Sequence, residues 1–243
     1  MGKAVRLDKF LADAGSGTRS EVKKLIQKGK VMVNGSAAKR PEQKITEEDE
    51  VSVNGEAVAA APEFEYFLLH KPAGCVSATE DAREKTVMEY VPSKRKGLFP
   101  VGRLDKDTEG LLLITDDGAL AHELLSPKKH VEKTYFARVS GIVTQEDVLA
   151  MEKGVDIGEE KLTLPARLEI LRTEQEAGGG MSEVSLTICE GKFHQVKRMM
   201  EAVGKQVVYL KRISMGPLTL PEDLERGECR PLTSEELEKL KSR

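Results

Sequence analysis

The sequence predicts an α+β protein whose main feature is a large, mostly antiparallel sheet. Predicted strands outnumber predicted helices over the 243 residues, and short turns separate most of the strands. Compact apolar runs at residues 67–69 and 111–114 are typical of buried strands, and residues 134–139 alternate with a period of two. A large, mainly antiparallel sheet is therefore the expected outcome.

The composition is that of a globular protein, with 39% hydrophobic and 33% charged residues. No apolar run approaches the roughly 18–20 residues that span a bilayer. The charged N-terminus is not followed by the apolar stretch of a secretory signal, so neither a membrane protein nor a secreted one is expected. The three cysteines are far apart, which disfavours disulfides and a cysteine zinc site and predicts a cytoplasmic protein.

Charge is distributed unevenly along the chain. The whole sequence has a net charge of −3, but residues 1–44 contain 11 Lys and Arg against 4 Asp and Glu, a net charge of +7. The other residues carry a net charge of −10. This asymmetry predicts a basic module attached to a domain of a different kind.

The basic module is predicted to hold two short helices and a small sheet. Apolar residues at positions 7, 10, 11 and 14 form one helical stripe, and Thr18 with Glu21 has the pattern of a capping box before the second helix. Short strands follow and turn at the Asn-Gly pairs 34–35 and 54–55. A basic face on such a unit is often only solvated, but the clustering here favours phosphate contacts.

Residues 5 to about 53 resemble the alpha-L RNA-binding motif, also called the S4 domain. The resemblance rests on RLDKFLADAG followed in outline by SR..VK.LI..GKV.VNG, with Thr18 near a position that is often serine. It implies RNA contacts from the basic residues Arg6, Arg19, Lys23, Lys24, Lys28 and Lys30. The small, uncharged residues that follow end in proline and read as a linker. We therefore predict an S4-like domain over residues 1–57, a linker over 58–63 and a second domain over 64–243.

In the second domain, helices are predicted at residues 119–125, at 145–153 and from Thr233 onward. Strands are predicted at 167–171, 183–189 and 207–213. A further helical stripe that ends at Gly204 consists of the apolar residues Phe193, Val196, Met199, Met200 and Val203.

An unusual acidic stretch, GRLDKDTEG at residues 102–110, lies between two apolar runs. A calcium loop beginning at Asp105 is one interpretation, but its ninth position would be Leu113 and its twelfth is not Glu. A charged surface turn is the second interpretation. The third is a catalytic carboxylate on a loop held between strands, where active residues concentrate.

The motif GRLDxxTxGLLLxT over residues 102–115 resembles the signature of pseudouridine synthases. The segments LHKPxG at 69–74, KTY at 133–135 and GKFHQVKRM at 191–199 also resemble family motifs, in the same order. With the N-terminal module, the chain is similar to the RsuA-type synthases that act on ribosomal RNA. This resemblance implies the pseudouridine synthase fold, a mixed and mostly antiparallel sheet flanked by helices.

The resemblance implies three catalytic residues: Asp105 as the essential carboxylate, Tyr135 against the target base, and Lys197 as the cation paired with Asp105. Lysine replaces the arginine that is more common in the wider family, and it lacks the bidentate fork. The substrate-binding residues that the resemblance implies are Arg103, Leu104, His194, Gln195 and Arg198. The four histidines lack metal-ligand spacing, so we predict no metal site.

The isomerisation cuts the bond from uracil nitrogen to ribose and rejoins ribose to carbon 5 of the base. It needs no cofactor, and the sequence has no nucleotide-binding glycine motif. The carboxylate acts either as a nucleophile or as a base toward the sugar. We expect a monomer that modifies ribosomal RNA or a pre-ribosomal particle, with small-subunit 16S RNA as the first choice. A sister enzyme of large-subunit 23S RNA, a non-catalytic ribosome-assembly protein and a metal-binding regulator are the alternatives.

Overall fold

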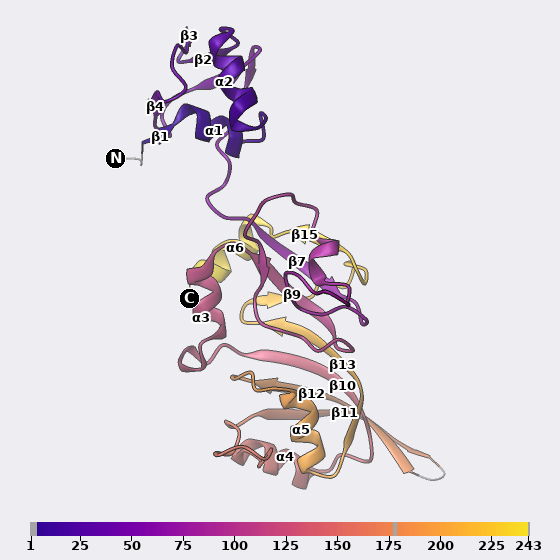
Figure 1. The fold of residues 1–243 in the computed structure, drawn as a ribbon. Helices are drawn as coiled ribbons and strands as arrows, with labels where there is room; N and C mark the ends of the chain where they lie inside the picture. Colours follow the sequence, from indigo (N-terminus) through magenta and orange to yellow (C-terminus); the bar gives the residue numbers. More distant parts are fainter. Residues whose placement is uncertain (1–3, 177–178, 243) are drawn as a thin grey trace. The chain divides into compact units, whose positions relative to one another are not determined.

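The computed structural model describes residues 4–176 and 179–242. The chain forms two compact units, residues 1–63 and 64–243, which are described separately (Figure 1). No helix of the described residues has the length and apolar character to cross a membrane.

The first unit packs two helices against short strands. Helix α1 is Leu7–Asp13 and α2 is Arg19–Gln27. The predicted capping box at the start of α2 is present: the Thr18 hydroxyl accepts from the Glu21 amide, and the Glu21 carboxylate accepts from the Thr18 amide. Both helices contribute buried side chains to one core, chiefly Leu7, Leu11, Val22 and Ile26. The described strands are β1 Val5–Arg6, β2 Val31–Val33, β3 Ser36–Ala37, β4 Lys44–Ile45, β5 Val51–Val53 and β6 Glu56–Ala57.

The second unit is built on a sheet that has nine strands among the described residues. The main path runs in the order β11-β12-β10-β13-β9-β7-β15, with β14 beside β13 and β8 beside β9. The strands are β7 Tyr66–Lys71, β8 Phe99–Pro100, β9 Glu109–Thr115, β10 Lys133–Ser140, β11 Arg167–Glu176, β12 Gly179–Ile188, β13 Gln206–Met215, β14 Leu218–Thr219 and β15 Cys229–Pro231.

Antiparallel pairing dominates this sheet, as the sequence predicts, but β13 and β9 run parallel. Their contact is short: Lys211 lies opposite Glu109, and Arg212 lies opposite Gly110. At this contact the backbones approach closely, because a Cβ atom on Gly110 would lie 2.2 Å from the carbonyl oxygen of Arg212. The φ angle of Gly110 is +109°, a conformation that glycine adopts readily and other residues rarely do.

Replacing Gly110 by alanine is therefore expected to destabilise the second unit by about 2–4 kcal/mol, through backbone overlap and strain. Urea unfolding followed by circular dichroism measures the change. Gly118→Ala is the matched control, because a Cβ there meets nothing within 4 Å and the position is helical. Equal stability of Gly110→Ala and the wild type would contradict the close approach of β9 to β13.

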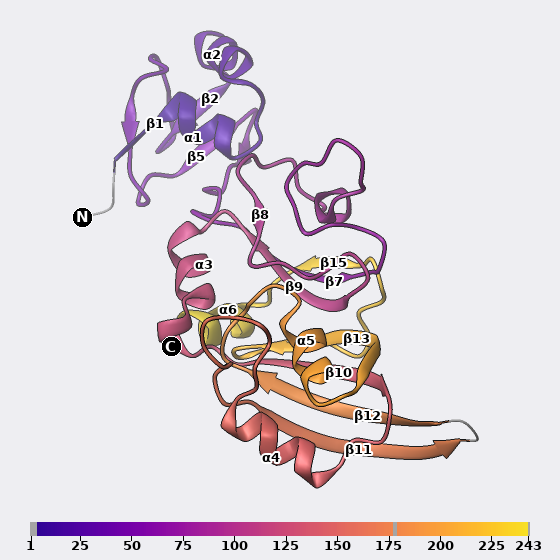
Figure 2. The same ribbon diagram turned by 60° about the horizontal axis from the view of Figure 1, so that its bottom comes forward.

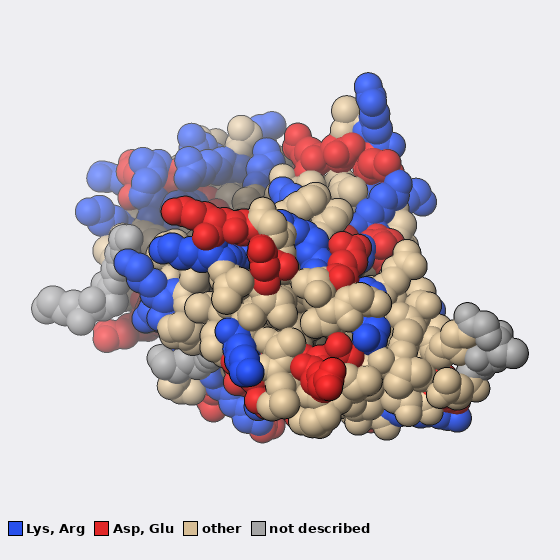
Figure 3. Space-filling model, turned by 90° about the horizontal axis from the view of Figure 1, so that it is seen from below, with Lys and Arg blue, Asp and Glu red and all other residues tan. Residues whose placement is uncertain are grey.

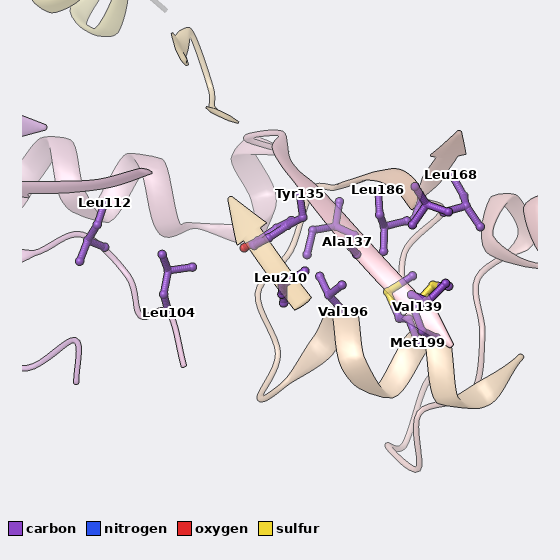
Figure 4. Packing of buried hydrophobic residues seen from close by; sticks show 14 of the residues in the cluster. Leu104, Leu112, Tyr135, Ala137, Val139, Leu168, Leu186, Val196, Met199 and Leu210 are labelled. Atoms are coloured by element: carbon purple, nitrogen blue, oxygen red, sulfur yellow. The ribbon is translucent and has the colours of Figure 1, made fainter. Parts of the chain in front are cut away.

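Four helices cover the two faces of the sheet (Figure 2). They are α3 Gly118–Leu125, α4 Gln145–Lys153, α5 Gln195–Ala202 and α6 Ser234–Lys241. Side chains of α4 and α5 join one buried cluster with β10 and β12, and Figure 4 shows Val196 near Ala137 and Leu210, and Met199 beside Val139. Side chains of α3 and α6 join a second cluster with β7 and β9. Two short 3-10 helices, Val87–Tyr90 and Pro127–Lys129, lie in the connections.

The prediction that Phe193 belongs to the apolar stripe of a helix is wrong. Helix α5 begins at Gln195, and His194 before it has a φ angle of +49°, in the left-handed region. The chain direction changes there, so Phe193 lies outside the helix and is 66% exposed. The rest of the stripe faces the core as predicted, with Val196, Met199 and Met200 buried.

Candidate active site

A cavity of about 470 Å³ lies on the helix α5 side of the second unit. Its walls come from the loop before β9, from β10 and β13, and from the segment that leads into α5. The lining residues are Gly102, Arg103, Leu104, Asp105, Thr108, Leu125, Lys133, Tyr135, Ile188, Gly191, Lys192, Phe193, His194, Gln195, Val196, Lys197, Leu210 and Arg212. This set brings together the segments at 102–108, 133–135 and 191–197, which are far apart in the sequence.

Asp105 lies in the cavity wall with its side chain 26% exposed. The Nζ atom of Lys197 is 3.3 Å from Oδ2 of Asp105, and Nε2 of His194 is 3.5 Å from Oδ1. Lys197 is on the first turns of α5, which places its ammonium over the loop before β9. The predicted pair of Asp105 and Lys197 is thus present as an ion pair, with the carboxylate accessible to a molecule in the cavity.

Asp107 is a second partner of Lys197 that sequence reasoning missed. The Lys197 Nζ atom donates to both Asp107 oxygens, at 2.7 and 2.8 Å, and these contacts are shorter than the one with Asp105. The hydrogen bond from Lys197 holds the pKa of Asp107 below its usual value. Burial opposes the charge of Lys197, but the two carboxylates outweigh it, so the pKa of Lys197 is raised. The ammonium therefore stays charged beside both carboxylates.

The loop that carries Asp105 is fixed by two buried side chains from elsewhere. The Ser77 hydroxyl donates to the Leu104 carbonyl at 2.9 Å and accepts from the Leu104 amide at 3.0 Å. The ammonium of Lys71, which is fully buried, donates to the carbonyls of Thr108, Pro72 and Lys106 at 2.9, 3.0 and 3.3 Å. Burial lowers the pKa of Lys71, and the nearby carboxylates of Asp107 and Asp105 act against that shift. These bonds preorganise the loop.

Tyr135 lies in the wall of the cavity and is 8% exposed. In the strand register it stands between Leu186 of β12 and Arg212 of β13. Figure 4 shows its ring and hydroxyl pointing along the sheet toward the side of Leu104. The ring therefore offers an aromatic edge and a hydroxyl to a planar ligand.

Two buried polar atoms at the cavity have no hydrogen-bond partner within the described residues. They are Oγ1 of Thr108 and Nη2 of Arg212, whose Nε donates to the Leu111 carbonyl at 2.7 Å. Buried polar groups are normally hydrogen-bonded, so this unsatisfied pair is an unusual feature of two residues that line the cavity. Sequence reasoning missed both residues, although Thr108 lies inside the acidic motif.

The predicted substrate-binding residues have different environments. Arg103, Leu104, His194 and Gln195 line the cavity. The Gln195 amide is held internally, because it donates to Glu190 at 2.8 Å and accepts from the Lys192 amide at 2.8 Å. The structure does not bring Arg198 to the cavity: its guanidinium binds Glu159 and the carbonyls of Phe193 and Ile157. His194 precedes α5 in the left-handed region, so it does not share a helix face with Arg198.

The carboxylates of the calcium-loop alternative do not converge. Glu109 lies in β9 and binds Tyr209 at 2.7 Å and Arg226 at 3.1 Å, whereas Asp116 binds Arg95 at 2.6 Å. Among the described residues, no group of three His, Cys, Asp or Glu side chains is arranged to hold a metal ion. The loop geometry is therefore that of strand and turn.

All six predicted RNA-binding residues are exposed on the first unit, and five of them are close together in the sequence. These five are Arg19, Lys23, Lys24, Lys28 and Lys30, on or just after α2. Arg6 differs, because its guanidinium donates to both oxygens of Asp8, at 3.0 and 2.9 Å. On the face shown in Figure 3, charged side chains of both signs are interspersed with uncharged surface.

Comparison with known proteins identifies both parts of the chain. The family model of RNA pseudouridylate synthases matches residues 65–202, and the model of the S4 domain matches residues 5–51. An uncharacterized RNA pseudouridine synthase of Bacillus subtilis is 48% identical over 236 residues, covering 96% of this chain and 97% of that protein.

Two further relatives are named for different ribosomal subunits. The ribosomal small subunit pseudouridine synthase A of Haemophilus influenzae is 42% identical and covers 97% of this chain and 99% of its own length. The ribosomal large subunit pseudouridine synthase B of Bacillus subtilis is 40% identical, covering 98% of this chain and 96% of its own.

A crystal structure of a pseudouridylate synthase, 41% identical in sequence, superposes with a TM-score of 0.66. The match covers 97% of this chain and 99% of that one. The predicted fold is thus confirmed over both units. The chain belongs to the RNA pseudouridine synthase family, with an S4 domain at its N-terminal end.

Proposed function

We propose that this enzyme isomerises one uridine of ribosomal RNA, in the small-subunit 16S RNA, and that Asp105 is its catalytic carboxylate. One observation carries the assignment of Asp105. It is the carboxylate that the accessible cavity exposes next to a cation, a histidine and a tyrosine wall. The cavity volume of about 470 Å³ accommodates one nucleoside, which must leave its stack in the RNA to enter.

In the proposed reaction, the nucleoside lies with its ribose at Asp105 and its base against Tyr135. The carboxylate either attacks the nucleoside covalently or takes a proton from the sugar and later returns it. The C1′–N1 bond breaks and a C1′–C5 bond forms, while C5 gives up its proton and N1 takes one up. The atoms of substrate and product are the same. Lys197 holds the carboxylate in position from 3.3 Å, while Thr108 and Arg212 line the cavity beside it.

The choice of the small subunit is supported by relatives of that name at 40–42% identity. A large-subunit relative at 40% identity keeps 23S RNA as the second candidate. Mapping pseudouridines in ribosomal RNA from cells that lack this protein tests the proposal. We expect one site of 16S RNA to lose its pseudouridine and to regain it with the wild-type gene. Loss of a 23S site instead would overturn the small-subunit assignment, and unchanged ribosomal RNA would overturn the substrate class.

The S4 unit is proposed to dock the enzyme on RNA through the exposed residues around α2. Replacing Lys23, Lys24 and Lys28 together by alanine is expected to weaken RNA binding and to make it less dependent on salt. The slope of log K against log salt should fall by about 0.7–0.9 for each lost phosphate contact. Filter binding at several salt concentrations measures the slope.

A chain of residues 64–243 should show a further loss of slope, since it lacks the whole unit. Arg172→Ala is the matched control, because this exposed cation lies on β11 of the other unit. If the triple variant has the slope of the wild type, the S4 unit is not the docking surface. We propose ribosomal RNA or a pre-ribosomal particle as the substrate, and the cytoplasm as the compartment in which the enzyme works.

A further inference from the structure

Phe193 has an unusual environment for a large apolar side chain. It is 66% exposed, the most exposed of the large hydrophobic side chains in the described part of the chain, and it lines the cavity. Its ring stacks on His194, with ring centroids 3.8 Å apart and an angle of 19° between the planes. His194 in turn places Nε2 3.5 Å from Asp105. Phe193 thus contacts His194, and His194 contacts Asp105. An exposed aromatic ring is therefore connected to the candidate catalytic carboxylate through one histidine.

The stacked pair is held in place by its surroundings. The Phe193 carbonyl accepts from Arg198 at 3.0 Å, and Arg198 also binds Glu159 at 2.9 Å. Gln195 fixes the Lys192 amide on the other side. His194 keeps a left-handed backbone, an arrangement that non-glycine residues adopt at a cost and that concentrates at functional sites. The backbone of this stacked pair, called the platform below, is thus anchored on both sides of Phe193.

The chemistry around the platform fits a nucleotide. Lys192, Lys197 and Arg103 line the same cavity and supply positive charge for phosphates. Aromatic rings beside cations bind single-stranded nucleic acid by stacking with its bases, with little sequence preference. When the target uridine turns into the cavity, the adjacent nucleotide of the RNA stays outside, at the mouth of the cavity. The base of that nucleotide then loses the uracil on which it was stacked.

We propose that Phe193 and His194 form a stacking platform for the nucleobase adjacent to the target uridine. The platform replaces the stacking that the neighbour loses, so it stabilises the RNA conformation in which the target is extruded. Phe193 is then a positioning residue, and Asp105 keeps the chemistry. The inference rests on the proposed function, because it needs an RNA strand whose uridine enters this cavity.

A fluorescence experiment tests the platform directly, because the protein contains no tryptophan. Phe193→Trp introduces one reporter at the platform, and single-stranded heptauridylate is the probe. Stacking of a base should quench the tryptophan emission on binding. An oligomer of seven abasic sugar-phosphate units should cause little quenching at saturation. Leu171→Trp, at a residue 55% exposed on β11, is the matched control and should not respond to either probe.

Affinity measurements separate stacking from general apolar contact. Phe193→Leu should weaken heptauridylate binding about tenfold and leave binding of the abasic oligomer unchanged, whereas Phe193→Tyr should bind heptauridylate as the wild type does. With ribosomal RNA as substrate, the acidic and basic limbs of the pH–rate profile should lie at the same pH in Phe193→Leu as in the wild type. Equal quenching by the two probes, or equal heptauridylate affinity of Phe193→Leu and wild type, would overturn the platform. Base-dependent quenching in Phe193→Trp, together with wild-type enzyme that isomerises no ribosomal RNA, would instead overturn the proposed function alone.

Discussion

Asp105→Asn is expected to reduce the single-turnover rate of isomerisation to less than about one hundredth of the wild-type rate. The substitution keeps the size of the side chain and removes the charge, the basicity and the nucleophilic oxygen. Folding should be retained, since Lys197 keeps Asp107 as its closer partner. RNA affinity should stay within about twofold, because the loss of one acidic group does not remove a phosphate contact.

Asp107→Asn is the matched comparison for this variant. It removes a carboxylate bound to the same ammonium, but its side chain is 73% exposed and it is not part of the cavity lining. Its rate should fall far less than that of Asp105→Asn. Rates come from rapid-quench detection of pseudouridine at saturating enzyme, and melting temperatures check the fold. One tenth of wild-type turnover in Asp105→Asn would show that another group is catalytic.

Lys197→Met is expected to have the second largest effect, on the rate more than on RNA binding. The ammonium lies between two carboxylates, at 3.3 Å from Asp105 and 2.7 Å from Asp107. At present it lowers the pKa of Asp107. Without it, Asp107 loses the hydrogen bond that lowers its pKa, and no ammonium lies beside Asp105. The acidic limb of the pH–rate profile should therefore move to higher pH.

Lys24→Ala provides the reciprocal comparison, because this exposed lysine lies on α2 of the other unit. Its loss should weaken binding to many RNAs alike and leave the saturating rate and both pH limbs unchanged. Single-turnover rates and dissociation constants of the two variants across pH distinguish the roles. A Lys197→Met enzyme with the wild-type saturating rate and acidic limb would mean that Lys197 is only an RNA-facing charge.

The sequence predicts much of the fold because local signals and tertiary packing agree. The capping box at Thr18 and the buried strand around residues 67–69 are local patterns that the structure retains. The prediction fails at Phe193, where apolar spacing alone suggests a core position. His194 interrupts the helical backbone there, and periodicity contains no information on such a change of direction.

The candidate site was only partly predictable for a related reason. Asp105, Tyr135 and Lys197 lie in motifs that resemble known segments, and the structure brings all three to one cavity. Asp107, by contrast, is a nearby acidic residue whose contact with Lys197 depends on the shape of the loop. Arg212 looks like an ordinary strand cation until its burial beside the cavity is seen. Such partners follow from three-dimensional packing, not from spacing.

The short parallel contact of β9 with β13 has a consequence for how the enzyme becomes active. Asp105 precedes β9 and Lys197 precedes β13, and the paired residues Gly110 and Arg212 are distant in sequence. Pairing these two residues closes a long loop of chain. The loss of chain entropy comes before the contacts that stabilise the pairing have formed. The carboxylate and its ammonium therefore meet only when the two halves of the sheet have joined. Isomerisation activity therefore shows that β9 and β13 have paired. The secondary-structure content of either half of the sheet does not show this.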